Sequence, residues 1–316
     1  MSRFPFGIPD SWYVMAYSED LAPGQTQALR ALDRELVLFR TEAGEAHVVD
    51  AFCPHLGAHL GVGGRVEGET IRCPFHGWRW NGEGRCVEVP YAKRLPEAAR
   101  LPTYPVREEN GMIFVWCHAS ASPPEFEIPR VAGWGEPGWL DRWLRWEWTV
   151  RTHPQEMAEN GIDWPHFATV HRMEMPDERF CEFRDHSFLW QVGGDKPVTA
   201  LESGTDSLQM FGENWGLGFS WLRQAGAYDT VVATGLTPID EETTHVRMGV
   251  IAHVGVDAAE SAREEVRAYM AEHAVFAEQD FPIWENKIHR ARPGLCTEDG
   301  PILEFRRWAS RFYSAG

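Results

Sequence analysis

Long apolar stretches are absent from this sequence. No run of 18 apolar residues occurs, and apolar stretches such as residues 111–117 and 248–256 have only the length of strands. The first residues lack the apolar core of a signal peptide, and no repeat or low-complexity tract follows them. We therefore predict a cytoplasmic protein without a membrane-spanning helix.

The sequence also contains few basic residues relative to acidic ones. The chain has 30 Lys and Arg residues against 47 Asp and Glu residues, a formal net charge of −17 at pH 7. This excess of negative charge argues against binding to nucleic acid or to an anionic membrane. Residues 65–100 are an exception. They contain seven basic and five acidic side chains, so their net charge is +2, whereas the net charge of the remaining residues is −19. This segment is either a basic rim that attracts an acidic partner or ordinary solvated surface.

Cysteine is scarce as well, with six residues in a chain of 316. Four of them are far apart in the sequence and are predicted to be buried free thiols, namely Cys86, Cys117, Cys181 and Cys296. The length and the hydrophobic content of 43% indicate a soluble protein with enough material for two domains.

The other two cysteines stand in two short boxes that each pair a cysteine with a histidine. The first box is Cys53-Pro-His55, and the second, after residues 56–72, is Cys73-Pro-Phe-His76-Gly-Trp. Two thiolates and two imidazoles are the ligands of a [2Fe–2S] cluster in which the histidines bind one of the irons. A structural zinc site also takes Cys and His, but the combination of these two boxes favours the cluster.

A second group of metal-binding residue types lies in a segment that is predicted as a helix over residues 153–170. Asn160, Asp163 and His166 are spaced i, i+3, i+6 and would fall on one helical face. His171 follows five residues after His166, about 140° further round an α-helix. Both imidazoles reach one metal only if the helix bends, and Pro165 supplies a cause for a bend.

Two histidines and one carboxylate that leave open positions form the facial triad of non-haem Fe(II) oxygenases. The alternative is that His166 and His171 are ordinary hydrogen-bonded polar residues. The third ligand would be a carboxylate remote in sequence, and Glu278, Asp280 and Glu285 all lie near the end of a helix predicted over residues 258–278. The residues alone leave the choice among these three acids open.

The remaining pattern predicts an α+β protein. Residues 1–118 are predicted to form an all-β domain, with Asn81-Gly82 as a hairpin turn and strands at residues 11–17, 35–40, 47–52, 70–73, 86–89 and 112–116. Residues 119–316 are predicted to form a helix-grip domain, in which a long helix crosses an antiparallel sheet. Its strands are expected at residues 144–151, 217–223, 230–236 and 246–254.

The two cysteine–histidine boxes resemble those of Rieske proteins, and specifically the oxygenase branch. Rieske subunits of respiratory complexes carry an extra cysteine in each box, where Ala58 and Phe75 stand here, and a serine where Trp78 stands. Without that disulfide and hydroxyl, the resemblance implies a cluster of lower potential. Residues 160–171 match every position of the Asn-x-x-Asp-x-x-His-x-x-x-x-His motif of Rieske non-haem iron oxygenases. The chain thus resembles the oxygenase (alpha) component of that family.

The resemblance assigns roles to the metal-binding residues. The Rieske domain would hold its [2Fe–2S] cluster through Cys53, His55, Cys73 and His76. The catalytic domain would bind a mononuclear Fe(II) through His166, His171 and Asp280. Asp280 is chosen because residues 279–287 resemble the segment of the family that contains the carboxylate ligand.

The resemblance also implies a quaternary structure. The family forms head-to-tail homotrimers in which the cluster of one subunit lies beside the iron of the next. Carried over, the Asp163 carboxylate would bridge His76 of one subunit and His166 of its neighbour, which orients both imidazoles and gives electrons a short route. Asn160 and Asp163 are accordingly predicted as catalytic residues.

The activity implied by the resemblance is oxygenation by O2, with electrons from a separate ferredoxin or flavin-dependent ferredoxin reductase. The absence of a flavin or nicotinamide motif agrees with a separate donor. Residues 279–287 and the C-terminal residues 304–313 look most like the group of 3-ketosteroid 9α-hydroxylases and cholesterol 7-desaturases. This implies that the chain hydroxylates or desaturates a hydrophobic small molecule, a steroid or sterol. The apolar stretch 215–221 would then line a large pocket, or it belongs to the core.

Two other functions stay open at this point. One is a Rieske oxygenase or O-demethylase for an aromatic substrate, which an arginine in the pocket would favour. The other is a non-catalytic electron carrier that uses only the cluster, against which the complete set of candidate iron ligands argues.

Overall fold

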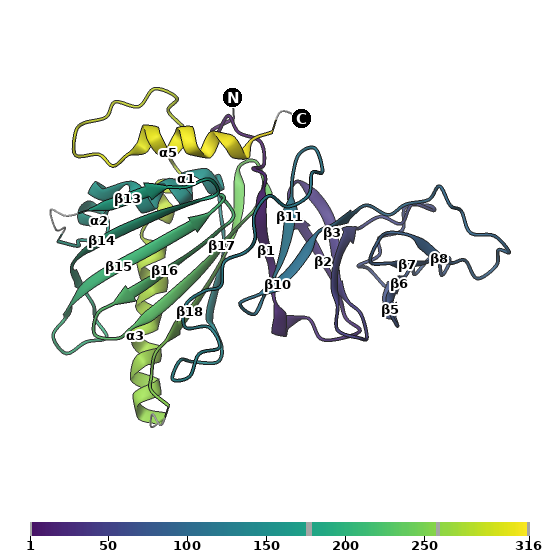
Figure 1. The fold of residues 1–316 in the computed structure, drawn as a ribbon, viewed down its shortest axis with the longest axis horizontal. Coiled ribbons are helices and arrows are strands. Elements are labelled where there is room, and N and C mark those ends of the chain that lie inside the picture. Colours follow the sequence, from purple (N-terminus) through teal and green to yellow (C-terminus); the bar gives the residue numbers. More distant parts are fainter. Residues whose placement is uncertain (1, 175–178, 257–259, 315–316) are drawn as a thin grey trace. The chain divides into compact units, whose positions relative to one another are not determined.

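Two compact units make up the computed structural model, which describes residues 2–174, 179–256 and 260–314. Residues 11–125 form the first unit, and residues 126–314 form the second together with residues 2–10 (Figure 1). The sequence predicts a first domain over residues 1–118, whereas residues 2–10 group with the second unit. They belong to the second because Arg3 donates hydrogen bonds to the carbonyl oxygens of Trp284 (2.7 Å) and Lys287 (2.9 Å).

Three antiparallel sheets build the first unit. The first sheet has the strand order β1 (Ser11–Tyr17), β11 (Met112–Cys117) and β10 (Val106–Glu109). The second has the order β2 (Thr26–Ala31), β3 (Arg34–Arg40), β4 (Ala46–Asp50) and β9 (Thr103–Tyr104). The third has the order β5 (Arg65–Glu67), β6 (Thr70–Arg72), β7 (Arg79–Asn81) and β8 (Cys86–Glu88). A short 3-10 helix, Ser18–Asp20, follows β1. The predicted strands correspond to β1, β3, β4, β6, β8 and β11. Strands of two or three residues, such as β5 and β9, are too short to show an alternating pattern.

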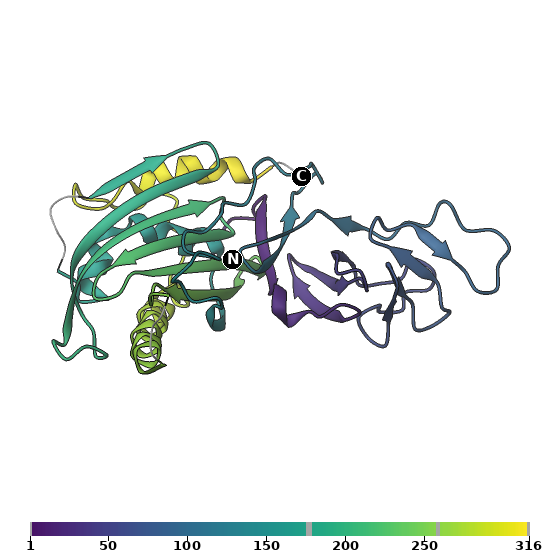
Figure 2. The same cartoon turned by 60° about the horizontal axis from the view of Figure 1, so that its bottom comes forward.

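A seven-stranded antiparallel sheet dominates the second unit (Figures 1 and 2). Its strands run in the order β12 (Leu144–Val150), β18 (Thr243–Ala252), β17 (Thr230–Asp240), β16 (Phe219–Ala225), β15 (Thr205–Trp215), β14 (Ser187–Pro197) and β13 (Phe180–Phe183). The long helix α3 (Glu260–Glu278) packs against β18 and β12. This arrangement confirms the predicted α+β class.

Helix α3 buries the residues that the helical spacing predicts. Val266, Met270 and Ala274 are at most 5% exposed, which places them on one face toward the sheet. The predicted start at residue 258 lies outside the described residues. Shorter helices follow α3, namely α4 (Phe281–Trp284), α5 (Ile302–Ala309) and the 3-10 helix Ser310–Phe312. No helix in the described parts of the chain is long and apolar enough to cross a membrane.

The predicted continuous helix over residues 153–170 is wrong. The segment consists of α1 (Pro154–Glu159), a 3-10 helix (Asn160–Ile162) and α2 (Trp164–Thr169). The break lies at Asp163, whose ψ of 78° is not helical, whereas Trp164 before the proline is the first residue of α2. Pro165 thus stands in the first turn of a new helix, where its missing N–H has no partner to lose. Asn160, Asp163 and His166 do not share one helical face.

Candidate functional site

Two loops of the first unit carry the cysteine–histidine boxes, and both have the same backbone hydrogen bond. Between β4 and β5, the N–H of Gly57 donates to the carbonyl oxygen of Cys53 (2.9 Å); between β6 and β7, the N–H of Gly77 donates to that of Cys73 (3.1 Å). Both glycines have positive φ, 74° and 73°, which glycine adopts without a steric penalty. The two cysteines are therefore presented by equivalent turns.

The side chains of the boxes face each other in pairs and fit a Rieske cluster. Cys53 and Cys73 are buried free thiols, and burial together with the neighbouring Cys73 raises the pKa of Cys53 to about 11. The rings of His55 and His76 are 4.7 Å apart, and the Nδ1 atom of each is buried without a hydrogen-bond partner. Such orphaned nitrogens are costly unless they bind something. Two thiols and two free Nδ1 atoms match the donors of a [2Fe–2S] cluster with mixed ligands.

Trp78 supports the first histidine. Its indole ring stacks on His55 at 4.2 Å and 9°, and its Nε1–H donates to the hydroxyl oxygen of Tyr91 at 2.8 Å. The ring that replaces the serine of respiratory Rieske proteins thus fixes the orientation of an imidazole rather than donating to the cluster.

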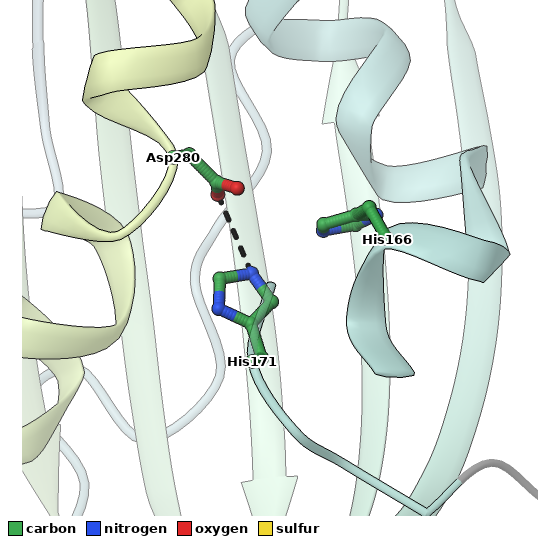
Figure 3. Close-up of side chains that lie close together, drawn as sticks. All are labelled: His166, His171 and Asp280. Atoms are coloured by element: carbon green, nitrogen blue, oxygen red, sulfur yellow. Dashed lines mark ion pairs between the residues drawn. The ribbon is translucent and has the colours of Figure 1, made fainter. Parts of the chain in front are cut away.

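In the second unit, His166, His171 and Asp280 offer ligand atoms that all lie within 4.8 Å of one another (Figure 3). His166 belongs to α2, His171 follows that helix, and Asp280 lies between α3 and α4. His171 Nε2 is 3.4 Å from Asp280 Oδ2. Within the ranges that the structure describes, no other three His, Cys, Asp or Glu side chains bring their ligand atoms this close together.

Hydrogen bonds orient both imidazoles of this cluster. His171 Nδ1 lies 2.8 Å from Oε1 of Gln279, and His166 Nδ1 contacts the backbone carbonyl oxygen of Asp163. Both partners only accept, so both Nδ1 atoms carry the proton and both Nε2 atoms keep a lone pair. His171 Nε2 is buried and has no hydrogen-bond partner. Two imidazole lone pairs beside a carboxylate fit a mononuclear iron with open positions.

Asn160 links two members of the cluster. Its Nδ2 atom lies 3.0 Å from Asp280 Oδ2 and 3.1 Å from His166 Nε2. The amide therefore donates to the carboxylate that the metal would also use, and it holds that carboxylate on the side of the histidines.

The three acids that the sequence offers as the third iron ligand, Glu278, Asp280 and Glu285, lie in different surroundings. Glu278 accepts a hydrogen bond from the Trp148 indole (2.9 Å), and Glu285 accepts one from the backbone N–H of Arg151 (3.4 Å). Asp280, which is 5% exposed, is the acid that meets the histidines.

Buried ion pairs fix helix α1, which leads into this cluster. Glu159 binds the guanidinium of Arg306 through two hydrogen bonds of 2.6 and 2.9 Å. Glu156 pairs with Lys287 (2.7 Å) and His289 (2.8 Å). Burial alone would raise the pKa of Glu156, but Lys287 and His289 together lower it below its ordinary value of 4.5. The ion pairs tie α1 to the segments that follow Asp280.

A cavity opens beside the cluster and has apolar walls. Its volume is about 190 Å³. Its walls combine the three proposed iron ligands with aromatic rings such as Trp148, Trp190, Phe276 and Trp284. No arginine or lysine occurs among the described residues that line it.

The inward face of the sheet forms the floor of this cavity. Because side chains alternate along a strand, residues two apart face inward together, and cross-strand partners form rows. One row contains Asn214, Ser220 and Thr234, which are paired across β15, β16 and β17. The next inward positions are apolar, with Leu222 opposite Val232. The stretch 215–221, proposed as a pocket wall, contributes only Ser220 among the described lining residues.

Gln279 was missed as a functional residue. It lies in the segment that suggested Asp280, but a glutamine without a metal-binding atom of the usual type gives no signal of its own. Its contact with His171 depends on the fold.

Two family models match the chain. Residues 11–105 match the Rieske [2Fe-2S] domain, and residues 115–313 match the 3-ketosteroid 9alpha-hydroxylase C-terminal domain. The second match alone covers more than half of the sequence.

Relatives are similar over nearly the whole chain. The oxygenase component of a 3-ketosteroid-9-alpha-monooxygenase of Rhodococcus rhodochrous is 33% identical over 337 residues, which cover 98% of this chain and 85% of that protein. The cholesterol 7-desaturase nvd 1 of Ciona intestinalis is 32% identical over 336 residues, which cover 97% of this chain and 69% of that protein.

Solved structures share the fold. Dicamba monooxygenase bound to dicamba superposes with a TM-score of 0.78 at 21% identity, over 96% of this chain and 97% of that one. NdmB of Pseudomonas putida CBB5 superposes with a TM-score of 0.73 at 17% identity, over 94% and 89%.

These findings confirm the predicted enzyme class and cofactors, a Rieske non-haem iron monooxygenase with a [2Fe–2S] cluster and a mononuclear iron. As an oxygenase component it uses O2 and receives electrons from a separate reductase or ferredoxin. The chain belongs to the family of Rieske oxygenases whose second domain is that of the 3-ketosteroid 9α-hydroxylases.

Proposed function

We propose that the chain hydroxylates or desaturates a steroid or sterol. The observation that carries this proposal is the cavity with apolar walls beside His166, His171 and Asp280. A cavity of this kind takes a mostly apolar molecule, because apolar surface is stabilised by leaving water. Relatives at 32–33% identity are named for ketosteroid oxygenation and cholesterol desaturation, which supports this substrate class.

His166, His171 and Asp280 are the proposed ligands of the mononuclear iron. Cys53, His55, Cys73 and His76 are the proposed ligands of the cluster. When bound by two imidazoles and a carboxylate, the iron supplies the activation of O2.

The protein's own residues prepare the site for this chemistry. Gln279 and the Asp163 carbonyl hold the two Nδ1 protons, so the Nε2 lone pairs face the metal position. The Asn160 amide keeps the Asp280 carboxylate from rotating away. The aromatic walls offer water few hydrogen-bond partners, so a bound substrate displaces it readily.

The charge of the cavity favours a neutral substrate. A carboxylate of an aromatic acid would need an arginine or lysine as its partner, and none of the described lining residues is either. The polar groups on the floor, such as Ser220 and Thr234, suit single hydroxyl or carbonyl groups. This weakens the alternative of an aromatic-acid oxygenase or O-demethylase.

The assembly and the electron donor complete the proposal. We propose a homotrimer in which Asp163 of one subunit connects its own His166 to His76 of the next, supplied by a ferredoxin or flavin-dependent ferredoxin reductase. The backbone carbonyl of Asp163 contacts its own His166, and the Asp163 side chain makes no hydrogen bond to α2, which it precedes, so the carboxylate is available for His76 of the next subunit. A cytoplasmic location stays a prediction.

A turnover assay tests the substrate class. The holoenzyme is supplied with a surrogate reductase and a panel of steroids and aromatic acids, and product masses are measured. A steroid that gains one oxygen or loses two hydrogens supports the proposal and distinguishes hydroxylation from desaturation. Turnover of aromatic compounds alone would overturn it and leave the enzyme class intact.

A further inference from the structure

One end of the cavity is polar and lies away from the proposed iron ligands. Gln224 on β16 and His273 on α3 both line it, and they are 3% and 8% exposed. His273 precedes Asp280 by seven residues, which along an α-helix corresponds to about 10 Å. Thr230 joins the two, since it is the cross-strand partner of Gln224 and its Oγ1 lies 3.3 Å from His273 Nε2.

His273 is fixed as a hydrogen-bond acceptor at this end. Its Nδ1 lies 3.1 Å from the carbonyl oxygen of Met270, which only accepts, so Nδ1 carries the proton. Burial and the nearby Lys196 lower the pKa of His273 to about 3, so the ring is neutral and Nε2 keeps its lone pair. The Thr230 hydroxyl oxygen lies 3.3 Å from Nε2, which is long for a hydrogen bond from a hydroxyl group.

A second network fixes the amide of Gln224. Burial and Asp206 raise the pKa of Tyr269 above its ordinary value of 10.0, so its hydroxyl stays protonated and donates to Asp206 Oδ2 at 2.6 Å. The Tyr269 oxygen accepts from Gln224 Nε2 at 2.9 Å. Because the nitrogen is committed to this bond, the orientation of the amide is set. Gln224 keeps its carbonyl oxygen and one N–H for other partners.

We infer that Gln224 and His273 bind the hydroxyl group of a steroid or sterol in preference to a ketone; this inference rests on the proposed function and deepens it. A hydroxyl group can donate to His273 Nε2 and accept from the free N–H of Gln224. A ketone can only accept, so it leaves His273 Nε2 and a carbonyl oxygen facing each other without a proton between them. A buried site that is built for a hydroxyl group strongly rejects an analogue that lacks the proton.

The floor between the two ends suits a rigid skeleton. Gln224 and Ser220 are four residues apart on β16, roughly 13 Å along a strand, and the inward position between them is Leu222, opposite Val232. An apolar band thus separates the Gln224–His273 end from the next polar row. A fused-ring molecule with a polar group at its end can lie across this band, with its other rings toward the iron ligands.

Equilibrium binding tests this inference without turnover. The holoenzyme, without a reductase, is titrated with 5α-androstan-3β-ol and 5α-androstan-3-one, which differ only at the polar group. Binding is followed by the fluorescence of the cavity tryptophans Trp148, Trp190 and Trp284. We expect the alcohol to bind about 10-fold more tightly or better. The variant His273→Gln introduces an amide N–H at this position and is expected to reduce the preference at least about 10-fold.

The matched control is His253→Gln, the same exchange at an exposed position outside the cavity, which should keep the wild-type preference. Equal binding of the two steroids by the wild type, or tighter binding of the ketone, overturns the inference and leaves steroid binding in place. A preference that survives in His273→Gln removes His273 from the recognition. If neither steroid changes the fluorescence, the proposed substrate class itself is overturned.

Discussion

Replacing Gln279 with leucine tests how the protein orients the imidazole of His171. Gln279 Oε1 lies 2.8 Å from His171 Nδ1, and the His171 side chain is 1% exposed. Water therefore has little access to replace the lost acceptor. The ring also stacks on Phe276 at 3.7 Å, so the substitution removes one of two restraints and should leave the fold intact.

The cost falls on the metal-bound state. In the metal-free variant, the His171 proton can move to Nε2, which lies 3.4 Å from Asp280 Oδ2, so Nδ1–H need not be buried without a partner. A metal on Nε2 forces the proton back to Nδ1, where an unpaired buried donor costs about 1–3 kcal/mol. We therefore expect metal affinity to fall roughly 10- to 100-fold, which is the usual effect of losing such an outer partner.

Metal competition measures this effect directly. Wild type, Gln279→Leu and Gln279→Glu are titrated with a chelator, and the iron lost from the mononuclear site is counted while the absorbance of the cluster serves as the internal standard. Gln279→Glu keeps an acceptor for Nδ1–H and should retain affinity. An affinity of Gln279→Leu equal to that of the wild type would refute the role of this hydrogen bond.

Three further predictions concern the support of the site. Arg306→Met leaves the Glu159 carboxylate buried without its partner, a loss of about 3–5 kcal/mol that should lower the Tm by roughly 6–20 °C. The control variant Arg223→Met breaks an exposed bidentate pair and should change the Tm little. Equal shifts of the Tm in the two variants would contradict the role of the Glu159–Arg306 pair. The lowered pKa of Glu156 contributes stability that is present above pH 4.5 and is lost as the pH falls through the folded-state pKa. In thermal melts at a series of acidic pH values, Glu156→Gln should therefore reduce the fall of the Tm with decreasing pH. An unchanged dependence of the Tm on pH would argue against this contribution of Glu156. Asp163→Asn should keep both metal centres but slow electron delivery to the iron, measured by single-turnover kinetics, and normal rates would exclude the bridge.

Local chemistry made the two metal centres predictable. The donor types of the Cys53 and Cys73 boxes restrict the possible metals, whatever the fold around them. The fold then decides which distant groups meet. Asp280 could not be separated from its acidic neighbours by residue type, and the resemblance alone favoured it; the chain brings it to the histidines because α3 ends two residues earlier.

Strand β15 escaped prediction because it turns polar residues inward. β15 alternates between buried and exposed positions along its length, but its inward side includes Asp206 and Asn214, so the apolar period is lost. Both residues belong to hydrogen-bond networks around the cavity. Sequence patterns fail at such positions because function has replaced the apolar side chains on which the patterns rest.

The helix break at Asp163 was not predicted at its observed position. Sequence rules place the disturbance at the residue before a proline, whereas here the chain breaks one residue earlier and starts α2 at Trp164. This leaves the Asp163 carbonyl oxygen free to orient His166.

An iron count on the purified wild type and on His171→Ala tests the central claim most directly. The account predicts about three irons per chain in the wild type, two in the cluster and one in the mononuclear site. The variant should hold about two irons, show the same cluster spectrum and lack turnover. A variant that keeps the full iron content and its activity would contradict the assignment of His166, His171 and Asp280 as the catalytic metal site.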